Sequence, residues 1–164
     1  MSDFDFQQLL REIRRFAGTA ADLAALQEFC VSRIAERLPK YDWVGFYMLD
    51  RNDPGVLVLG PFRGAPTAHV RIPVTQGICG AAVAQAETIV IDDVASDPRY
   101  LACSLETKSE IVVPVHARGE MVGEIDIDSQ TRGAFGREDR AFLEECAAIV
   151  GQFTERLVRP DISE

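Results

Sequence analysis

The stretch of sequence that decides the fold is Glu110-Ile111-Val112-Val113-Pro114-Val115-His116-Ala117-Arg118-Gly119-Glu120-Met121-Val122-Gly123-Glu124-Ile125-Asp126-Ile127-Asp128. Its first half is rich in β-branched residues, and acidic and apolar residues alternate at its end, so both halves predict strands. Arg118-Gly119 lies between them, and glycine favours a tight hairpin turn. We therefore expect antiparallel strands at 110–116 and 120–128.

Helices and further strands are expected on both sides of this hairpin. Apolar residues recur at helical spacing and predict helices at 4–16, 20–37 and 137–156. Runs rich in β-branched and aromatic residues predict strands at 41–49, 56–59, 68–72 and 88–91, with a short helix at 77–84. Since helices cluster at the ends of the chain and strands in the middle, we predict an α+β fold. A central antiparallel β-sheet would carry the terminal helices on one face and a loop-covered ligand pocket on the other.

The length of 164 residues fits one domain. We expect a single domain over residues 1–164, with a core over about residues 20–156. The helix at 4–16 would precede this core, and a flexible tail would occupy 158–164.

The charge balance excludes several classes of partner. With 17 basic and 26 acidic residues, the formal net charge is −9. Such a chain is unsuited to nucleic acid or to an anionic membrane surface, because both need clustered lysine and arginine. The first residues lack the features of a signal peptide, and no apolar run approaches the length of a membrane span. We therefore expect a cytoplasmic protein, in which cysteines are kept reduced.

The strand at 120–128 places three carboxylates on one face. Because strand side chains alternate, Ile125 and Ile127 would face the helices, whereas Glu124, Asp126 and Asp128 would face the other way. This acidic face is either a solvated surface or a site for a cation, such as a metal ion or the ammonium group of a substrate.

The hairpin turn decides whether Glu110 joins these carboxylates. A three-residue loop, Ala117-Arg118-Gly119, would pair Glu110 with Asp126 on the same face. A two-residue loop would put Glu110 on the opposite face. Crowded carboxylates raise one another's pKa, so one of them could keep a proton near neutral pH and act as an acid.

The four cysteines fall into two groups. Cys30 and Cys146 lie on apolar helical stripes and are predicted to be core residues. Cys79 lies near the expected start of the short helix, where the helix dipole would lower the pKa of its thiol, although it could also be a small buried residue. Cys103 lies in an expected loop, a position typical of functional residues.

Histidines and cysteine spacing give no sign of a metal site. The chain has only two histidines, His69 and His116, and no CxxC motif. We therefore expect no metal.

Aromatic residues crowd the strand at 41–49. Trp43, Gly45 and Tyr47 share one face, while Val44 and Phe46 share the other. Since both faces are apolar, something must cover each of them. A hydrophobic pocket for a small ligand fits this pattern.

Six motifs together resemble the free methionine-(R)-sulfoxide reductases, which are single GAF domains. The resemblance spans about residues 35–155. The motifs are Tyr41-Asp42-Trp43-Val44-Gly45-Phe46-Tyr47, Leu59-Gly60-Pro61-Phe62, Gly77-Ile78-Cys79-Gly80, Leu101-Ala102-Cys103-Ser104, Ser109-Glu110-Ile111-Val112-Val113-Pro114 and Gly123-Glu124-Ile125-Asp126-Ile127-Asp128.

The resemblance implies a thiol-based reduction of free methionine-(R)-sulfoxide without a cofactor. Cys103 falls on the family's catalytic cysteine, whose thiolate attacks the sulfoxide sulfur and becomes a sulfenic acid. A second cysteine then forms a disulfide with it, which thioredoxin reduces.

The resemblance also implies which residues bind the substrate. Glu110, Asp126 and Asp128 would hold the ammonium group and protonate the departing oxygen. Trp43 and Tyr47 would enclose the methyl group. Amphipathic end helices would pair two copies of the chain into a homodimer.

The sequence departs from the family at His69, which stands ten positions before Cys79, where the family commonly has its resolving cysteine. Cys103 is then resolved by Cys79, by an external thiol, or not at all. His69 would either stabilise the Cys103 thiolate or form part of the pocket wall. Ser109 is a candidate auxiliary residue.

Two other functions remain open from the sequence. The first is a small-molecule-binding GAF module without chemistry. The second is a peroxide sensor that uses Cys79 and Cys103.

Overall fold

The structure is a computed structural model that describes residues 4–101 and 105–157. Along the chain its elements are α1 (Phe6–Ala17), α2 (Leu23–Arg37), β1 (Trp43–Leu49), β2 (Val56–Arg63), β3 (Arg71–Pro73), α3 (Gly77–Gln85), β4 (Ile89–Ile91), the 3-10 turn η1 (Val94–Ser96), β5 (Ser109–Ala117), β6 (Glu120–Ser129) and α4 (Arg137–Leu157). The predicted flexible tail at 158–164 lies outside the described residues.

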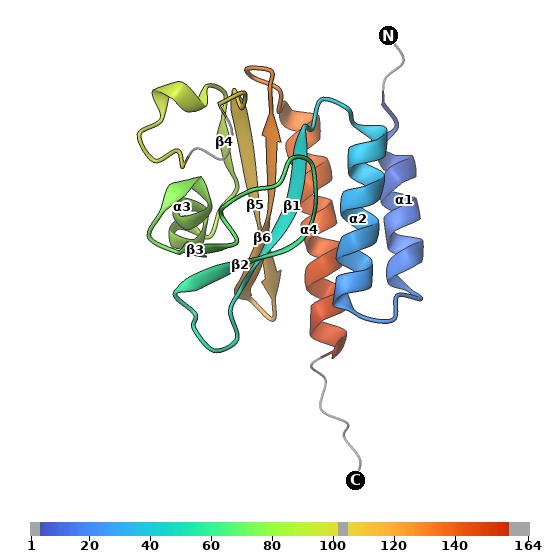
Figure 1. The fold of residues 1–164 in the computed structure, drawn as a ribbon. Helices are drawn as coiled ribbons and strands as arrows, with labels where there is room; N and C mark the ends of the chain where they lie inside the picture. The colour runs from blue at the N-terminus through green and yellow to red at the C-terminus, as the bar shows by residue number, and fades with distance from the viewer. Residues whose placement is uncertain (1–3, 102–104, 158–164) are drawn as a thin grey trace.

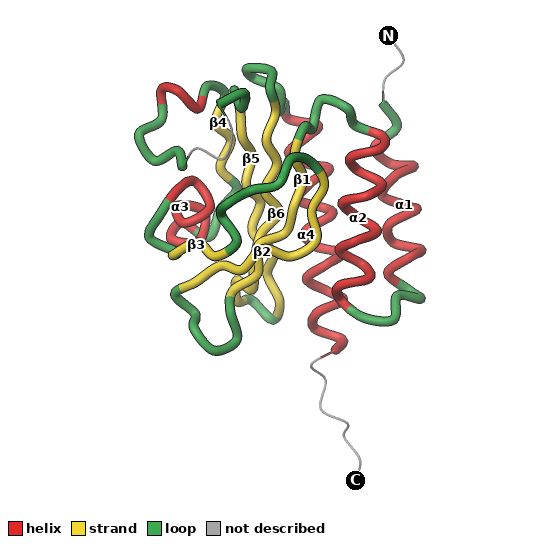
Figure 2. Tube along the Cα trace, viewed as in Figure 1, coloured by secondary structure: helices red, strands yellow, loops and turns green. Residues whose placement is uncertain are grey.

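The strands form one six-stranded sheet in the order β3-β2-β1-β6-β5-β4, and every neighbouring pair is antiparallel. Helices α1, α2 and α4 lie on one side of the sheet, and α3 lies on the other with the connecting loops (Figures 1 and 2). The predicted α+β fold, with an antiparallel sheet and terminal helices on one face, is confirmed.

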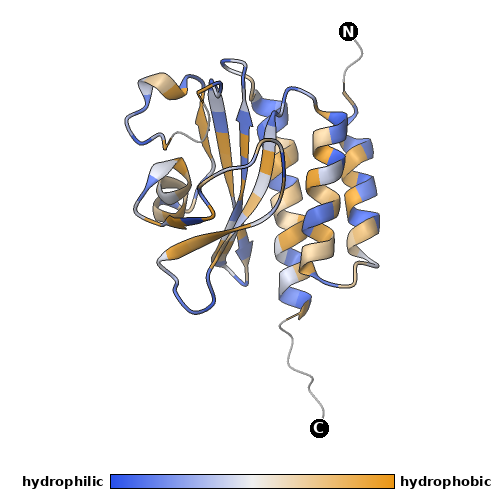
Figure 3. Ribbon diagram, viewed as in Figure 1, coloured by the Kyte–Doolittle hydropathy of each residue, from blue (hydrophilic) through white to orange (hydrophobic). Residues whose placement is uncertain are grey.

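Side chains from α1, α2, α4 and one sheet face form the larger core. Ile111, Ile125 and Ile127 leave the sheet toward the helices and are at most 1% exposed. They meet Leu26 of α2 and Leu143 of α4, both fully buried. Hydrophobic and hydrophilic residues are interspersed along these helices (Figure 3), as expected for helices with one face on a core.

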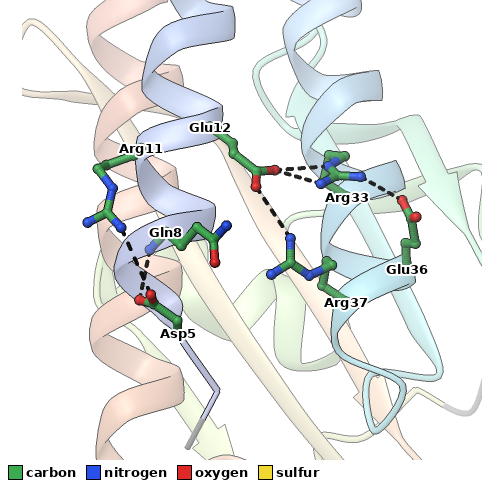
Figure 4. Close-up of polar contacts among 7 residues, drawn as sticks. All are labelled: Asp5, Gln8, Arg11, Glu12, Arg33, Glu36 and Arg37. Carbon is green, nitrogen blue, oxygen red and sulfur yellow. Dashed lines mark hydrogen bonds and ion pairs between the residues drawn. The ribbon is translucent and has the colours of Figure 1, made fainter.

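An ion-pair network joins α1 to α2 on the surface (Figure 4). Arg33 lies 2.7 Å and Arg37 3.3 Å from the Glu12 carboxylate, and Arg33 also pairs with Glu36 at 2.9 Å. The hydrogen bond from Arg33 lowers the pKa of Glu12. Such half-exposed pairs add little energy each, so the network mainly fixes how α1 lies on α2.

Two predicted strands begin two or three residues later than expected, because their first residues are used elsewhere. Tyr41 precedes β1, and its hydroxyl donates a 2.6 Å hydrogen bond to Asp139 of α4. The strand predicted at 68–72 is only β3, because residues 64–70 form a loop over the sheet. We call residues 64–70 the cover loop.

The hairpin between β5 and β6 has a two-residue turn, which is the second of the two loops considered from the sequence. Ala117 pairs with Glu120, and Arg118 and Gly119 both have positive φ, 53° and 75°. A turn of this kind matches the twist of the strands, and glycine adopts such a φ without strain.

A β-bulge follows this turn and restores the face that Glu110 shares with the acidic residues. His116 pairs with Met121 but Val115 pairs with Gly123, so Val122 is an extra residue in β6. Beyond the bulge Glu110 pairs with Asp128 rather than with Asp126. A two-residue loop was expected to put Glu110 on the opposite face, and the bulge is the reason that it does not.

Among the described residues, no helix combines the length and apolar character that crossing a membrane requires.

Candidate active site

The second face of the sheet carries aromatic residues of β1 and acidic residues of β6 in direct pairs. Trp43 pairs with Asp128 and Tyr47 with Glu124. Between them Gly45 pairs with Asp126, and a Cβ atom on Gly45 would come within 2.3 Å of the Trp43 ring. Glycine at position 45 therefore lets the Trp43 indole lie flat over β1.

Four carboxylates on this face are buried. Glu110, Glu124, Asp126 and Asp128 are each at most 5% exposed. Both carboxylate oxygens of Glu124 and the Oδ1 atoms of Asp126 and Asp128 are buried without a hydrogen-bond partner. The interpretation of the acidic face as a solvated surface is therefore wrong.

Burial raises the pKa of three of these acids. It is the main cause for Glu124, Asp126 and Asp128, because a low-dielectric environment disfavours the charged form. For Asp128 the negative charges of Asp126 and Asp42 raise the pKa further. The crowding expected from the sequence is thus only a secondary cause, and burial is the main one.

Cys79 lies in the first turn of α3 and points into the same cluster. Its Sγ atom and one oxygen from each of Glu110 and Asp126 lie within 4.8 Å of one another. The predicted lowering of its pKa is wrong. Burial first, and then the charges of Asp126, Glu124 and Glu110, raise the pKa of the Cys79 thiol well above its usual range. Desolvation and three acids outweigh the dipole of a nine-residue helix.

The described residues of this face line two hollows near the carboxylates. The first is enclosed by Cys79, Glu110 and Asp126 together with Ile72, Gln76, Gly77, Ile78 and Leu101. The second lies beside Asp128 and Trp43, under the cover loop residues Ala65, Pro66 and Thr67. The catalytic residue predicted from the sequence, Cys103, lies outside the described residues, but Leu101, two positions before it in sequence, lines the first hollow.

The two aromatic residues hold the cover loop in place. The Trp43 indole nitrogen donates to the Ala65 carbonyl at 3.1 Å, and the Tyr47 hydroxyl donates to the His69 carbonyl at 2.8 Å. The two rings lie 6.1 Å apart. His69 is half-buried in this loop, and its backbone carbonyl contacts the site by accepting the hydrogen bond from Tyr47.

Ser109 lies away from this site. Its hydroxyl donates to the Thr131 carbonyl at 2.5 Å and accepts from the Ala134 amide at 3.4 Å. Because it precedes Glu110 in a strand, it faces the helix side. The structure thus gives Ser109 a role in anchoring the segment after β6 and does not place it in the pocket.

Cys30 and Cys146 are core residues, as predicted. Both are 0% exposed and lie among the helix-side apolar residues. Burial raises the pKa of Cys30 to about 12 and also raises the pKa of Cys146. Neither thiol shares the pocket with Cys79.

Glu124 was not among the site residues chosen from the sequence. It lies directly opposite Tyr47 and is fully buried. The signal was present in the alternation of acidic and isoleucine residues over 124–128, which assigns Glu124 and Asp126 to one face.

The GAF domain family model matches residues 6–152. The chain belongs to the GAF domain family. A free methionine-R-sulfoxide reductase of Escherichia coli is 39% identical over 144 residues, which cover 88% of this chain and 81% of that protein. These matches confirm the resemblance seen in the sequence.

Two solved structures of similar proteins agree with this. A type II free methionine-R-sulfoxide reductase from Thermoplasma acidophilum is 40% identical with a TM-score of 0.76, covering 88% of this chain and 96% of that one. The free methionine-R-sulfoxide reductase from Neisseria meningitidis, solved in complex with its substrate, is 33% identical with a TM-score of 0.87. The match covers 94% of this chain and 92% of that one. Both identity and fold therefore relate this GAF domain to that group of enzymes.

Proposed function

We propose that this GAF domain reduces free methionine-(R)-sulfoxide to methionine, with Cys103 as the nucleophile. The observation that carries the proposal is the buried group of Cys79, Glu110 and Asp126 at one hollow, with Asp128 at the hollow under the cover loop. The relationship to reductases of this name, one of them solved with its substrate, supports it.

The carboxylates explain why the substrate would be the free amino acid. Asp126 and Asp128 each keep a buried oxygen without a hydrogen-bond partner, which is costly unless a ligand satisfies it. An α-ammonium group supplies three donors and a positive charge. A methionine sulfoxide within a peptide has no ammonium group, so it would leave these acids uncompensated.

The aromatic residues would bind the other end of the substrate. Trp43 and Tyr47 lie beside Asp128 and Glu124 and present apolar ring surface to the pocket face. They would enclose the methyl group of the sulfoxide, while the hydrogen bonds to Ala65 and His69 fix the rings.

The chemistry is two-electron reduction at sulfur. The Cys103 thiolate attacks the sulfoxide sulfur, the S–O bond breaks, and methionine leaves while Cys103 takes up the oxygen as a sulfenic acid. The departing oxygen needs a proton during this step. Asp126 or Asp128 would supply it, because burial raises the pKa of both and so favours their protonated forms.

Cys79 is the proposed resolving thiol. It lines the hollow next to Leu101, whereas Cys30 and Cys146 lie in the core on the opposite side of the sheet. Its thiol attacks the Cys103 sulfenic acid to form a disulfide, and the thiol proton leaves with the hydroxyl as water. Because the pKa of Cys79 is high, this step needs a base, and Asp126 or Glu110 lies within reach.

The cycle is closed by a dithiol donor. We propose thioredoxin, which returns two electrons and two protons to the disulfide. Such a cycle fits the reducing cytoplasm, and the long helices on one face are the proposed contact of a homodimer.

A single-turnover experiment tests this mechanism. Reduced protein, freed of excess reductant, is mixed with free methionine-(R)-sulfoxide, and methionine and remaining thiols are counted after unfolding. The wild type should form one methionine per chain and lose two thiols. Cys79→Ser should still form one methionine but lose one thiol and leave a sulfenic acid that dimedone traps. Two thiols lost in Cys79→Ser would contradict the role of Cys79, and no methionine from the wild type would contradict the function.

A further inference from the structure

The cluster of Cys79, Glu110 and Asp126 also has the composition of a metal site. One ligand atom from each residue lies within 4.8 Å of the other two, and all three side chains are at least nine-tenths buried. The three residues come from α3, β5 and β6, so the sheet and the packed helix hold them together. No metal was expected from a sequence with two histidines and no CxxC motif, since only the fold brings the cysteine to the acids.

Asp126 has one carboxylate oxygen without a partner in the part of the chain that the structure describes. Its Oδ1 atom is buried without a hydrogen bond while it lines the hollow beside Cys79. A buried carboxylate oxygen of this kind is stabilised by a cation that enters the hollow. The buried position of Asp126 Oδ1 at the hollow therefore points to a bound cation.

We propose that a thiophilic divalent cation, with Zn²⁺ as the representative, binds reversibly to Cys79 Sγ and to carboxylate oxygens of Glu110 and Asp126. The cation would occupy the place of the substrate ammonium group and so inhibit the enzyme. The inhibition rests on the proposed function, whereas the binding does not.

The donor set favours zinc over harder cations. Zinc takes sulfur and oxygen ligands in a tetrahedral arrangement, with Zn–S near ~2.3 Å and Zn–O near ~2.1 Å. These bonds place neighbouring ligand atoms about 3.6 Å apart, so atoms already within 4.8 Å need only a small inward shift. Magnesium and calcium prefer six or more oxygen ligands, which this hollow does not offer among the described residues.

Binding involves no redox step. Cys79 binds as a thiolate, and its proton passes to the solvent when the metal–sulfur bond forms. With three protein ligands, the fourth position is left to water.

Cobalt(II) tests the site directly, because it accepts the ligands of zinc and shows a thiolate-to-cobalt charge-transfer absorption only when sulfur is bound. Phosphine-reduced protein in a non-chelating buffer is titrated with Co²⁺, and Zn²⁺ affinity is then measured by displacement. The wild type should bind one equivalent with the charge-transfer band. Cys79→Ser should lose the band and weaken Zn²⁺ binding by more than about 100-fold, since even second-shell changes commonly cost 10–100-fold.

Two matched variants make the result specific. Cys30→Ser removes a buried thiol from the helix-side core, and Cys103→Ser removes the proposed nucleophile; both should keep the band and the affinity. Asp126→Asn should keep sulfur coordination but weaken binding, and circular dichroism checks that each variant is folded. A band that survives in Cys79→Ser, or that disappears in Cys103→Ser, would overturn the proposed ligands.

Activity separates this proposal from the proposed function. Zn²⁺ should raise the apparent KM for methionine sulfoxide without lowering kcat, and an added chelator should reverse the effect. A chain that turns over substrate but gives no cobalt band contradicts the metal site alone. A chain that binds cobalt through Cys79 but never reduces methionine sulfoxide contradicts the proposed function and leaves the metal site standing.

Discussion

The two faces of the central sheet are built from the same strands, yet they differ in almost every physical property. On the helix side Ile125 and Ile127 lie fully within an apolar core. Their neighbours in sequence, Glu124 and Asp126, face the other side of the sheet. They are also buried, but they keep carboxylate oxygens without hydrogen-bond partners. The comparison teaches that burial alone does not identify a core, because the isoleucines gain stability from burial whereas the acids lose it.

This difference is what an enzyme site requires. The helix-side core, together with the smaller apolar cluster around Trp43 and Tyr47, stabilises the sheet enough to carry the uncompensated acids of the pocket face. Substitutions on the two faces should therefore change different quantities, and the following predictions use this to test the comparison.

The largest effect is expected in the helix-side core. Leu143→Ala removes a fully buried side chain of α4 and should lower the free energy of unfolding by about 2–5 kcal/mol, through lost transfer energy and a cavity. Denaturant unfolding measures the loss. Activity per folded molecule, measured well below the melting temperature, should be unchanged; a large fall in it would mean that the two faces are not separable.

Neighbouring residues on opposite faces give the sharpest contrast. Asp126→Asn should lower kcat/KM by about 100-fold or more, which is about 2.7 kcal/mol of lost transition-state stabilisation, and leave stability equal or higher. Ile127→Val should cost about 1 kcal/mol of stability and leave kcat/KM unchanged. Steady-state kinetics and denaturant unfolding measure both. If Asp126→Asn destabilises the fold more than Ile127→Val, the pocket face is part of the stabilising core.

The third prediction concerns pH. Burial raises the pKa of Glu124, so the folded state binds that proton more tightly than the unfolded state. This contribution to stability is complete below the pKa of the unfolded state, near 4.5, and is lost as pH rises through the pKa of the folded state. The stability of the wild type relative to Glu124→Gln should therefore fall by at least about 1 kcal/mol between pH 5 and pH 8.

Denaturant unfolding of both proteins at each pH measures this difference. Glu124→Gln carries no titrating group at this position, so common effects of pH on other residues cancel. A difference that is flat, or that grows with pH, would contradict a protonated acid under the pocket.

The smallest effect is expected at the cover loop. Tyr47→Phe keeps the ring but removes the 2.8 Å hydrogen bond to the His69 carbonyl. It should cost about 1 kcal/mol of stability and raise KM several-fold, because the loop is held less firmly over the substrate. Denaturant unfolding and steady-state kinetics measure the two effects. Unchanged values for both would mean that this bond does not position the loop.

The sequence predicts the order of elements and the separation of the two faces, because these depend on local periodicity. The alternation over 124–128 assigns each isoleucine and each acid to its side without any tertiary information. The burial of Cys30 and Cys146 follows in the same way from their apolar helical stripes.

Features that depend on tertiary contacts were predicted wrongly or not at all. The bulge at Val122 sets the pairing of Glu110 with Asp128, and one residue of bulge leaves no distinct local pattern. The pKa of Cys79 depends on acids brought from β5 and β6, which outweigh the local helix dipole. The cover loop is held through carbonyl oxygens of Ala65 and His69, and these backbone acceptors occur in every residue, so no side-chain motif reveals them.

The central claim is that the pocket face reduces free methionine-(R)-sulfoxide through Cys103. Thioredoxin-coupled oxidation of NADPH, with dithiothreitol as a second donor, measures it in the wild type, Cys103→Ser and the core variant Cys30→Ser. The account predicts turnover in the wild type and in Cys30→Ser, and none in Cys103→Ser. Equal turnover in Cys103→Ser, or no turnover in the wild type with either donor, would contradict it.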